Sequence, residues 1–270
     1  MRELERDHPD EARPNPGGAE LPPLAVVGPG RTGGAIATAA ERAGLRVELA
    51  GRDTAPDACR RAEIALLCVP DGAVPEACEA LAPAVPPLRF VGHVSGALSL
   101  DALSPARERG AQVFSLHPLQ TIPDAGTDLT GAPCAVSGSS DKAEHLAEEL
   151  AGRLGMRPFG VPEEARAAYH AAASIASNLF VALEESAAEL LERAGIEDSR
   201  ELLAPLVLRT AANWAERGPG ALTGPIARGD TDTVERHMAA LRETAPDLLP
   251  VYEALAERAR ELADAREARA

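Results

Sequence analysis

The chain has 270 residues, of which 45% are hydrophobic and 3% aromatic, and its formal net charge is −15 at pH 7. This length and apolar content suffice for a full hydrophobic core in one large or two modest domains. The negative charge and the scarcity of aromatic rings exclude a nucleic-acid-binding protein, because such proteins need basic grooves and rings on which bases stack.

Residues 1–23 are charged and rich in proline and glycine, and they contain no apolar run that could serve as a signal or a membrane span. We therefore expect a disordered tail on a cytoplasmic protein that contacts no membrane.

The four cysteines, Cys59, Cys68, Cys78 and Cys134, form no CxxC pair and do not cluster with histidine. This spacing indicates neither a disulfide framework nor a metal site. We expect small, reduced and mostly buried side chains.

The segment 24–37, LAVVGPGRTGGAIA, places a glycine-rich turn between an apolar strand and an alanine-rich helix. Gly28 would make the tight turn, Gly30 would let the backbone approach a pyrophosphate, and Gly33 would let the helix pack on its strand. The order of strand, turn and helix predicts a dinucleotide-binding site. The candidate cofactor-binding residues at the first and third strand ends are Gly28, Gly30, Arg31, Thr32, Gly33, Val69 and Pro70.

The residue at the end of the second strand indicates whether the cofactor is NADP(H) or NAD(H), because it contacts the adenosine ribose. Arg52 at this position favours the 2′-phosphate of NADP(H) through charge-assisted hydrogen bonds. Asp53 follows directly, and a strand end misplaced by one residue would favour NAD(H) instead. Arg52 could also be a solvated loop charge.

Seven apolar runs, most of them separated by helical patterns, predict a doubly wound, mostly parallel sheet over residues 24–161. Substrate and cofactor should meet at the carboxyl ends of these strands. The expected strands are 24–28, 46–51, 64–69, 89–94, 112–117, 133–138 and 157–161.

Strand signals stop after residue 161, so residues 162–270 should form an all-α domain for substrate binding and dimerisation. One long helix is expected from Glu163 to Arg193. A polar stripe on this helix consists of His170, Ser174, Ser177 and Asn178. This stripe would either face a substrate cleft or be satisfied in a core network or at a solvated edge.

Polar residues follow the fourth and fifth strands. His117 is a candidate for proton transfer, although a histidine before proline can also just hold a loop carbonyl. Ser95 and Asn178 could orient a carbonyl or the nicotinamide, and Gln120 could contact the substrate. We expect His93 to support the adjacent turn.

Arg228 lies in the segment GPIARGD and should begin a helix, where a cation gains nothing from the helix dipole. It is a candidate clamp for a substrate carboxylate. A salt bridge to Asp230 or Asp232 is the alternative.

The motifs GPGRTGG, CVPDGAV, HVSGALSLDAL, FSLHPLQTIP, YHAAASIASN and LTGPIARGD together resemble bacterial proteins that pair a Rossmann-like domain with a helical domain of unknown function. Those proteins belong to the broad group of 6-phosphogluconate dehydrogenase, ketopantoate reductase, pyrroline-5-carboxylate reductase and prephenate dehydrogenase. The resemblance implies the fold and hardly constrains the substrate.

Ser95, His117 and His170 stand where prephenate dehydrogenases carry a serine and two histidines. The lysine after the serine motif and the glycine-rich continuation of the HP motif are both missing here. The departure argues against prephenate as the substrate.

Ketopantoate reductases carry a catalytic lysine on the long helix, one turn before an asparagine. If Asn178 matches that asparagine, Ser174 takes the place of the lysine, which makes Ser174 a candidate substrate contact. The only lysine of this chain, Lys142, falls in a helix pattern of the first domain. Acid–base chemistry is therefore expected from histidine, whose ordinary pKa near 6.5 suits proton exchange at neutral pH.

These observations predict an NADP(H)-dependent oxidoreductase that acts on a small carbonyl or hydroxy acid, similar to a 2-oxo acid, in a cleft between the domains. A non-catalytic NADP(H) sensor or interaction protein is the alternative, and a deazaflavin-dependent reductase is a third reading. We also expect a homodimer through residues 163–255.

Overall fold

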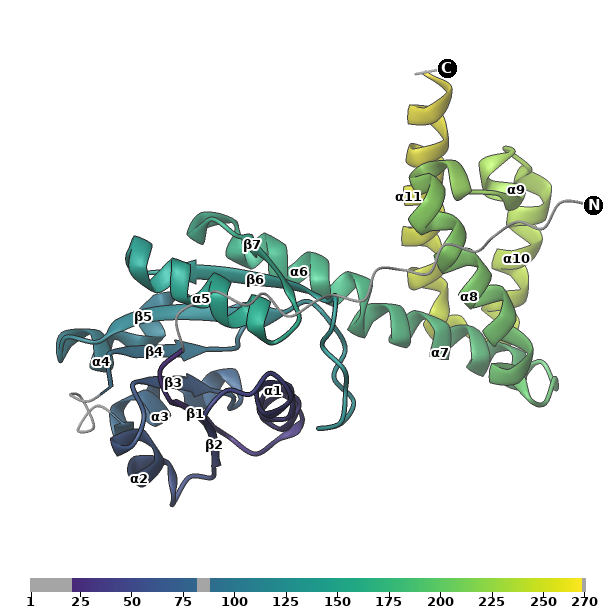
Figure 1. The fold of residues 1–270 in the computed structure, drawn as a ribbon. Coiled ribbons are helices and arrows are strands. Elements are labelled where there is room, and N and C mark those ends of the chain that lie inside the picture. Colours follow the sequence, from purple (N-terminus) through teal and green to yellow (C-terminus); the bar gives the residue numbers. More distant parts are fainter. Residues whose placement is uncertain (1–20, 82–87, 269–270) are drawn as a thin grey trace, which may run out of the picture. The chain divides into compact units, whose positions relative to one another are not determined.

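The computed structural model describes residues 21–81 and 88–268 (Figure 1). By its internal contacts the chain divides into two units, Met1–Ala173 and Ser174–Ala270. The division lies later in the chain than the expected start of the helical domain at residue 162. Most of the expected tail, residues 1–20, lies outside the described residues, whereas Leu21 is buried in the core.

The first unit is built on one sheet with the strand order β2-β1-β3-β4-β5-β6-β7. Its strands are β1 (Leu24–Val27), β2 (Val47–Ala50), β3 (Ile64–Leu67), β4 (Phe90–His93), β5 (Gln112–Pro118), β6 (Pro133–Gly138) and β7 (Arg157–Gly160). All neighbours pair in parallel except β5 and β6, which are antiparallel. The expected doubly wound, mostly parallel sheet is confirmed.

Helices cover both faces of this sheet (Figure 1). Alternate residues of β1 point to opposite faces, so Leu24 and Val26 join one hydrophobic cluster while Ala25 and Val27 join another. The first cluster contains residues of α1 (Arg31–Arg42) and α5 (Asp141–Arg153). The second contains residues of α2 (Ala55–Arg60), α3 (Val74–Leu81) and α4 (Ser104–Glu108).

Burial explains why the strand patterns are so apolar. Every residue of β1 and β3 is buried, as parallel strands covered on both faces require. The edge strand β7 is exposed throughout. The four cysteines are free and buried, as predicted.

The expected long helix is interrupted. It is divided into α6 (Arg166–Ala176) and α7 (Asn178–Arg193), preceded by the 3-10 helix η4 (Glu163–Ala165). Ser177 has φ −127° and ψ −77°, outside the helical region, although the carbonyl of Ser177 still accepts a hydrogen bond from the Val181 N–H. The prediction of one continuous helix over residues 163–193 was therefore wrong.

The second unit is helical, as expected. It contains α7, α8 (Ser199–Arg217), α9 (Gly224–Ala227), α10 (Thr231–Thr244) and α11 (Leu249–Glu267). In the described part of the chain, no helix combines the length and the apolar character needed to cross a membrane.

Candidate active site

Two glycines of the turn after β1 have no room for a side chain. Gly28 has φ +113°, and a Cβ there would overlap the carbonyl oxygen of Cys68. A Cβ on Gly33 would overlap the carbonyl oxygen of Gly28. Gly28 therefore lets the turn pass close to the end of β3, and Gly33 lets α1 pack close to the end of β1.

Gly30 is different, because a Cβ there would meet nothing within 4 Å. It precedes α1, whose first turn has no acidic residue and no side-chain cap on its N–H groups. The start of a 12-residue helix thus presents unsatisfied N–H donors beside open space. This arrangement fits a pyrophosphate.

A cavity of about 190 Å³ lies at the end of β2. Its wall includes Gly28, Arg52 and Val69, and Asp53 is not part of it. Arg52 is exposed, and its nearest carboxylate is that of Glu76 at 3.8 Å. The cavity fits an adenosine whose 2′-substituent Arg52 would meet.

A second cavity, of about 280 Å³, lies at the carboxyl ends of β3, β4 and β5. We call it the histidine cavity. It joins the glycine turn to the polar strand ends, since its lining contains Arg31, Thr32, Val69, Asp71, Val94, Ser95, Gly96, His117, Pro118, Gln120, Ile122 and His170. Three of the predicted cofactor residues, Arg31, Thr32 and Val69, therefore line the same cavity as both candidate histidines.

His117 is held from behind by a tyrosine. The distance from its Nδ1 to the Tyr169 hydroxyl is 2.7 Å, and its ring centroid lies 6.0 Å from that of His170. A Cβ on Gly96 would stand 2.8 Å from both imidazoles, so that glycine leaves the two rings room. His170 belongs to the first unit and does not reach His117 from the second, contrary to expectation.

Burial dominates the electrostatics of this pair. Burial, followed by the charges of His170 and Arg166, lowers the pKa of His117 to about 4. Burial raises the pKa of the Tyr169 phenol to about 12. The expectation that His117 titrates near neutral pH was therefore wrong, because desolvation disfavours the imidazolium.

The other strand-end residues have structural partners. The Ser95 hydroxyl accepts hydrogen bonds from the N–H groups of Ala97 (3.1 Å) and Leu98 (3.0 Å), so it closes a turn and can still donate. Gln120 donates to the Asp128 carbonyl at 2.9 Å. His93 is fully buried, with Nε2 3.4 Å from the Ser99 carbonyl, and supports its turn as predicted.

Three candidates lie in the second unit and do not line the histidine cavity. The Asn178 amide oxygen accepts a hydrogen bond from the Ser177 hydroxyl, and the Ser174 carbonyl accepts one from the Ser177 N–H. Arg228 follows the short helix α9 and does not begin a helix. It lines a cavity of about 480 Å³ together with Asp230 and Arg260.

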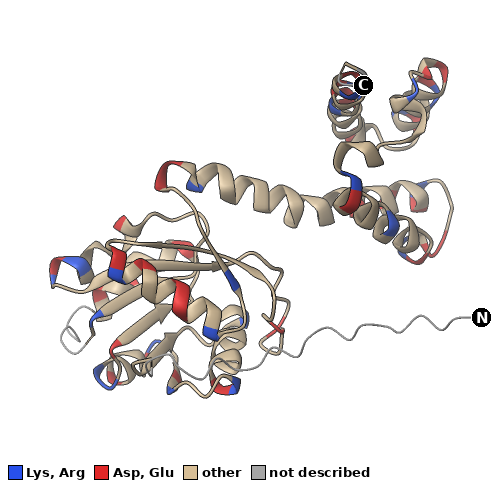
Figure 2. Ribbon diagram, turned by 45° about the horizontal axis from the view of Figure 1, so that its top comes forward, with Lys and Arg blue, Asp and Glu red and all other residues tan. Residues whose placement is uncertain are grey.

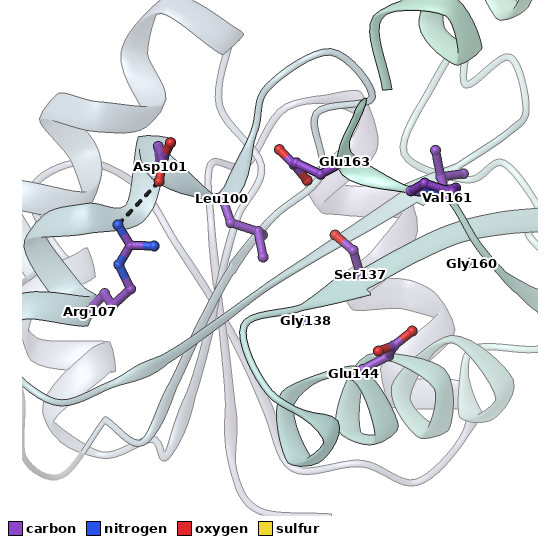
Figure 3. Close-up of a pocket in the computed structure, with 10 residues that line it drawn as sticks. Leu100, Asp101, Arg107, Ser137, Gly138, Glu144, Gly160, Val161 and Glu163 are labelled. Carbon is purple, nitrogen blue, oxygen red and sulfur yellow. Dashed lines mark hydrogen bonds and ion pairs between the residues drawn. The ribbon is translucent and has the colours of Figure 1, made fainter. Parts of the chain in front are cut away.

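A larger cavity, of about 630 Å³, lies beside the carboxyl ends of β6 and β7, which run opposite to the other strands (Figure 3). Its lining also includes Asp101 and Arg107, which pair with each other and follow β4 in the chain. The lining contains neither the glycine turn nor the histidines. Sheets of this type bind their ligands at the carboxyl ends of the parallel strands, here β1 to β5, so the histidine cavity is the candidate active site.

Comparison with known families confirms the resemblance drawn from the motifs. Residues 35–118 match a Rossmann-like domain. Residues 132–259 match the domain of unknown function DUF2520. The two matches follow one another along the chain, and the DUF2520 match begins before β6. No curated protein sequence matches the chain.

Solved structures share the fold over nearly the whole chain. A Bacteroides fragilis protein, provisionally named an NADP oxidoreductase, is 21% identical with a TM-score of 0.74, over 90% of this chain and 99% of its own. Protein TM1727 from Thermotoga maritima is 22% identical with a TM-score of 0.70, and the match covers 90% of this chain and 99% of TM1727. A reductive aminase from Aspergillus terreus, solved with NADPH and ethyl levulinate, is 20% identical with a TM-score of 0.64, over 88% and 93%. At these identities the likeness establishes the fold alone.

Proposed function

We propose that this protein is an NADP(H)-dependent oxidoreductase that interconverts a small carbonyl compound, similar to a 2-oxo acid, and its hydroxy form. The observation that carries the proposal is the histidine cavity, where an uncapped helix start and two histidines line the same space, and where Tyr169 holds one of those histidines. The names of the Bacteroides protein and the NADPH-bound aminase support the choice of cofactor.

Bound NADPH supplies a hydride. The N–H groups at the start of α1 would hold its pyrophosphate beside Gly30, and Arg52 would contact the 2′-phosphate. Val69 and Thr32 line the histidine cavity on the side of the glycine turn, so they would position the ring that carries the hydride.

His117 would meet the substrate oxygen as a neutral imidazole. With Tyr169 donating to Nδ1, the proton of His117 resides on Nε2, which becomes a hydrogen-bond donor to the carbonyl. As the oxygen gains negative charge, it takes the Nε2 proton while the phenol returns one to Nδ1. Nε2 then takes up a proton from water and Nδ1 returns its proton to the half-buried Tyr169, which restores the starting tautomer.

Turnover of a substrate panel tests the proposal. We expect NADPH oxidation with a 2-oxo acid or an imine, and His117→Ala or His170→Ala should lower kcat by roughly 10²–10⁴ with almost unchanged NADPH affinity. Both variants at full turnover would reject a histidine mechanism. NADPH binding without turnover of any substrate would favour the sensor, and turnover that requires a deazaflavin would favour the third reading.

We further propose a homodimer. No Asp, Glu, Lys or Arg occurs between Arg166 and Glu184, and this stretch is uncharged in Figure 2. Ile175 and Val181 within it are each 63% exposed, and α8 exposes more large apolar side chains. Exposed apolar patches of this kind mark protein interfaces, and a second copy of the chain is the partner we expect.

A further inference from the structure

A row of buried polar side chains crosses the otherwise apolar sheet beneath the histidine cavity. Ser115 of β5 stands directly opposite Ser137 of β6 and next to His93 of β4. Because side chains alternate along a strand, Ser115 and His117 share one face of β5. The row therefore lies on the same face of the sheet as His117, two residues earlier along β5.

Arg166 caps this row. Its Nη2 donates to the hydroxyls of Ser115 (2.9 Å) and Ser137 (2.6 Å), and its Nε lies 3.3 Å from a Glu163 carboxylate oxygen. It is 3% exposed and is the only Asp, Glu, Lys or Arg among the buried side chains of the described chain. Ser137 and Glu163 line the larger cavity beside the ends of β6 and β7 (Figure 3).

The partners of Arg166 compensate its charge only in part. Serine hydroxyls are neutral, and the one carboxylate, that of Glu163, is half-exposed to water. A buried charge in such surroundings acts strongly on nearby titratable groups, since little solvent screens it.

The same helix brings Arg166 and the partners of His117 together. Tyr169 and His170 follow Arg166 at i+3 and i+4, so all three share one face of α6. The hydrogen bonds of Arg166 to the two serines fix the start of α6 on the sheet. They therefore also determine where Tyr169 and His170 lie relative to His117.

We infer that Arg166 is a positioning residue of the proposed active site: it seats α6 on the two serines, and its buried charge adds to desolvation in keeping the imidazole of His117 neutral. The inference rests on the proposed function only in giving His117 a role there. The neutral form is what allows His117 to accept from Tyr169 and to donate from Nε2.

Several charged or titratable groups act on His117, and Arg166 is the permanent cation among those that lower its pKa. The others are His170 of α6, His93 of β4 and Asp71 of the 3-10 helix η1 (Asp71–Ala73). Arg31 of α1 lines the same cavity, and the Tyr169 hydroxyl of α6 contacts Nδ1 of His117. Asp71 opposes the effect of Arg166, because its carboxylate raises the pKa of His117.

The test follows the imidazole itself, so it needs neither cofactor nor substrate. Histidine Cε1 resonances are recorded between pH 3 and 8, and His117 is assigned by its absence in His117→Gln. The unmodified protein should keep His117 neutral above about pH 5, with its midpoint near pH 4. Arg166→Gln should raise its titration midpoint by about one unit, a tenfold gain in proton affinity. Arg166→Lys, which keeps the charge, should restore the low midpoint.

Arg107→Met is the matched control, because it removes an arginine of the same unit that also pairs with a carboxylate, that of Asp101, but is exposed to water. This variant should leave the titration midpoint of His117 unchanged. An unchanged midpoint in a folded Arg166→Gln protein overturns the inference, as does a Lys variant that behaves like the Gln variant.

A second substitution decides the question if Arg166→Gln does not fold. Ser137→Asp sets a carboxylate against the guanidinium without emptying the core, and it should also raise the midpoint. Ser139→Asp adds the same charge at an exposed position two residues further on and should not. Equal effects of the two aspartates would overturn the inference. Failure of the proposed function would show instead as absent turnover with these titrations intact.

Discussion

Arg52 lines the smaller cavity and is exposed, so its charge is available to a ligand. We predict that NADPH binds more tightly than NADH and that Arg52→Ala narrows the ratio of the two affinities by about 10- to 100-fold, the range of a charge-assisted hydrogen bond. Calorimetric titration of both cofactors measures the ratio. Asp53→Ala is the control, and a larger loss of NADH binding there would show that Asp53 reads the ribose.

The buried His93 and the partly buried His117 link stability to pH. The pKa values of His93 and His117 are lowered from 6.5 to about 4, chiefly by burial. Between those values the unfolded chain binds more protons than the native one, so stability rises with pH from about 4 to 6.5 and falls as the pH drops through that window. Each histidine contributes on the order of 3 kcal/mol over the full window.

Urea unfolding at pH 5 and pH 7.5 checks this prediction. His117→Gln should reduce the difference between the two free energies of unfolding, because glutamine does not titrate. His145→Gln, on the exposed face of α5, serves as the control and should leave the difference intact. A His117→Gln protein with the full pH dependence would contradict the lowered pKa.

Single residues also show where sequence reasoning stopped. His117 and His170 could be chosen from the chemistry of strand ends and of a polar stripe. Tyr169 and Arg166 were missed, because a tyrosine in an apolar pattern resembles a core residue and an arginine resembles a solvated charge. The available signal was the pair Ser115 and Ser137, two hydroxyls on one face of apolar strands that required a donor.

At the scale of elements, different glycines of the glycine turn are expected to serve stability and cofactor binding. Gly33→Ala should lower the free energy of unfolding by about 1–3 kcal/mol, because its Cβ would overlap the Gly28 carbonyl. Gly30→Val should change it little, because open space surrounds that position. Cofactor affinity should nevertheless fall in Gly30→Val, for NADPH and NADH alike.

Thermal unfolding and cofactor titration of the two variants measure these effects. Intact binding by Gly30→Val would place the pyrophosphate elsewhere. A Gly33→Ala protein as stable as the parent would mean that α1 can move away from β1 at little cost.

The sheet could be predicted strand by strand, since buried parallel strands are continuous apolar runs between turn residues. The break in the helix at Ser177 could not be predicted from the sequence. Apolar spacing continues through it with the period of a helix, and a kink at one residue leaves that spacing nearly unchanged. The reversed direction of β6 was equally invisible, because an apolar run has the same appearance in either orientation.

For the whole molecule, we predict a dimer in solution. Leu206 of α8 is 63% exposed, and Leu206→Glu should shift the mass measured by light scattering at micromolar concentration from two chains to one. Leu49→Glu, at the exposed β2 edge of the sheet, is the control and should leave the mass unchanged. A monomeric parent protein would refute the prediction.

The composition of the chain provides one optical reporter in each unit. Lys142, the only lysine, is exposed on α5 with its ammonium 5.7 Å from the centre of the Phe90 ring. Trp214, the only tryptophan, is exposed on α8 in the second unit. Once the terminal amine is blocked, an amine-reactive dye marks α5 alone, and the native indole serves as its energy donor. Fluorescence transfer between the two then follows the separation of the units as NADPH is added, without any engineered residue.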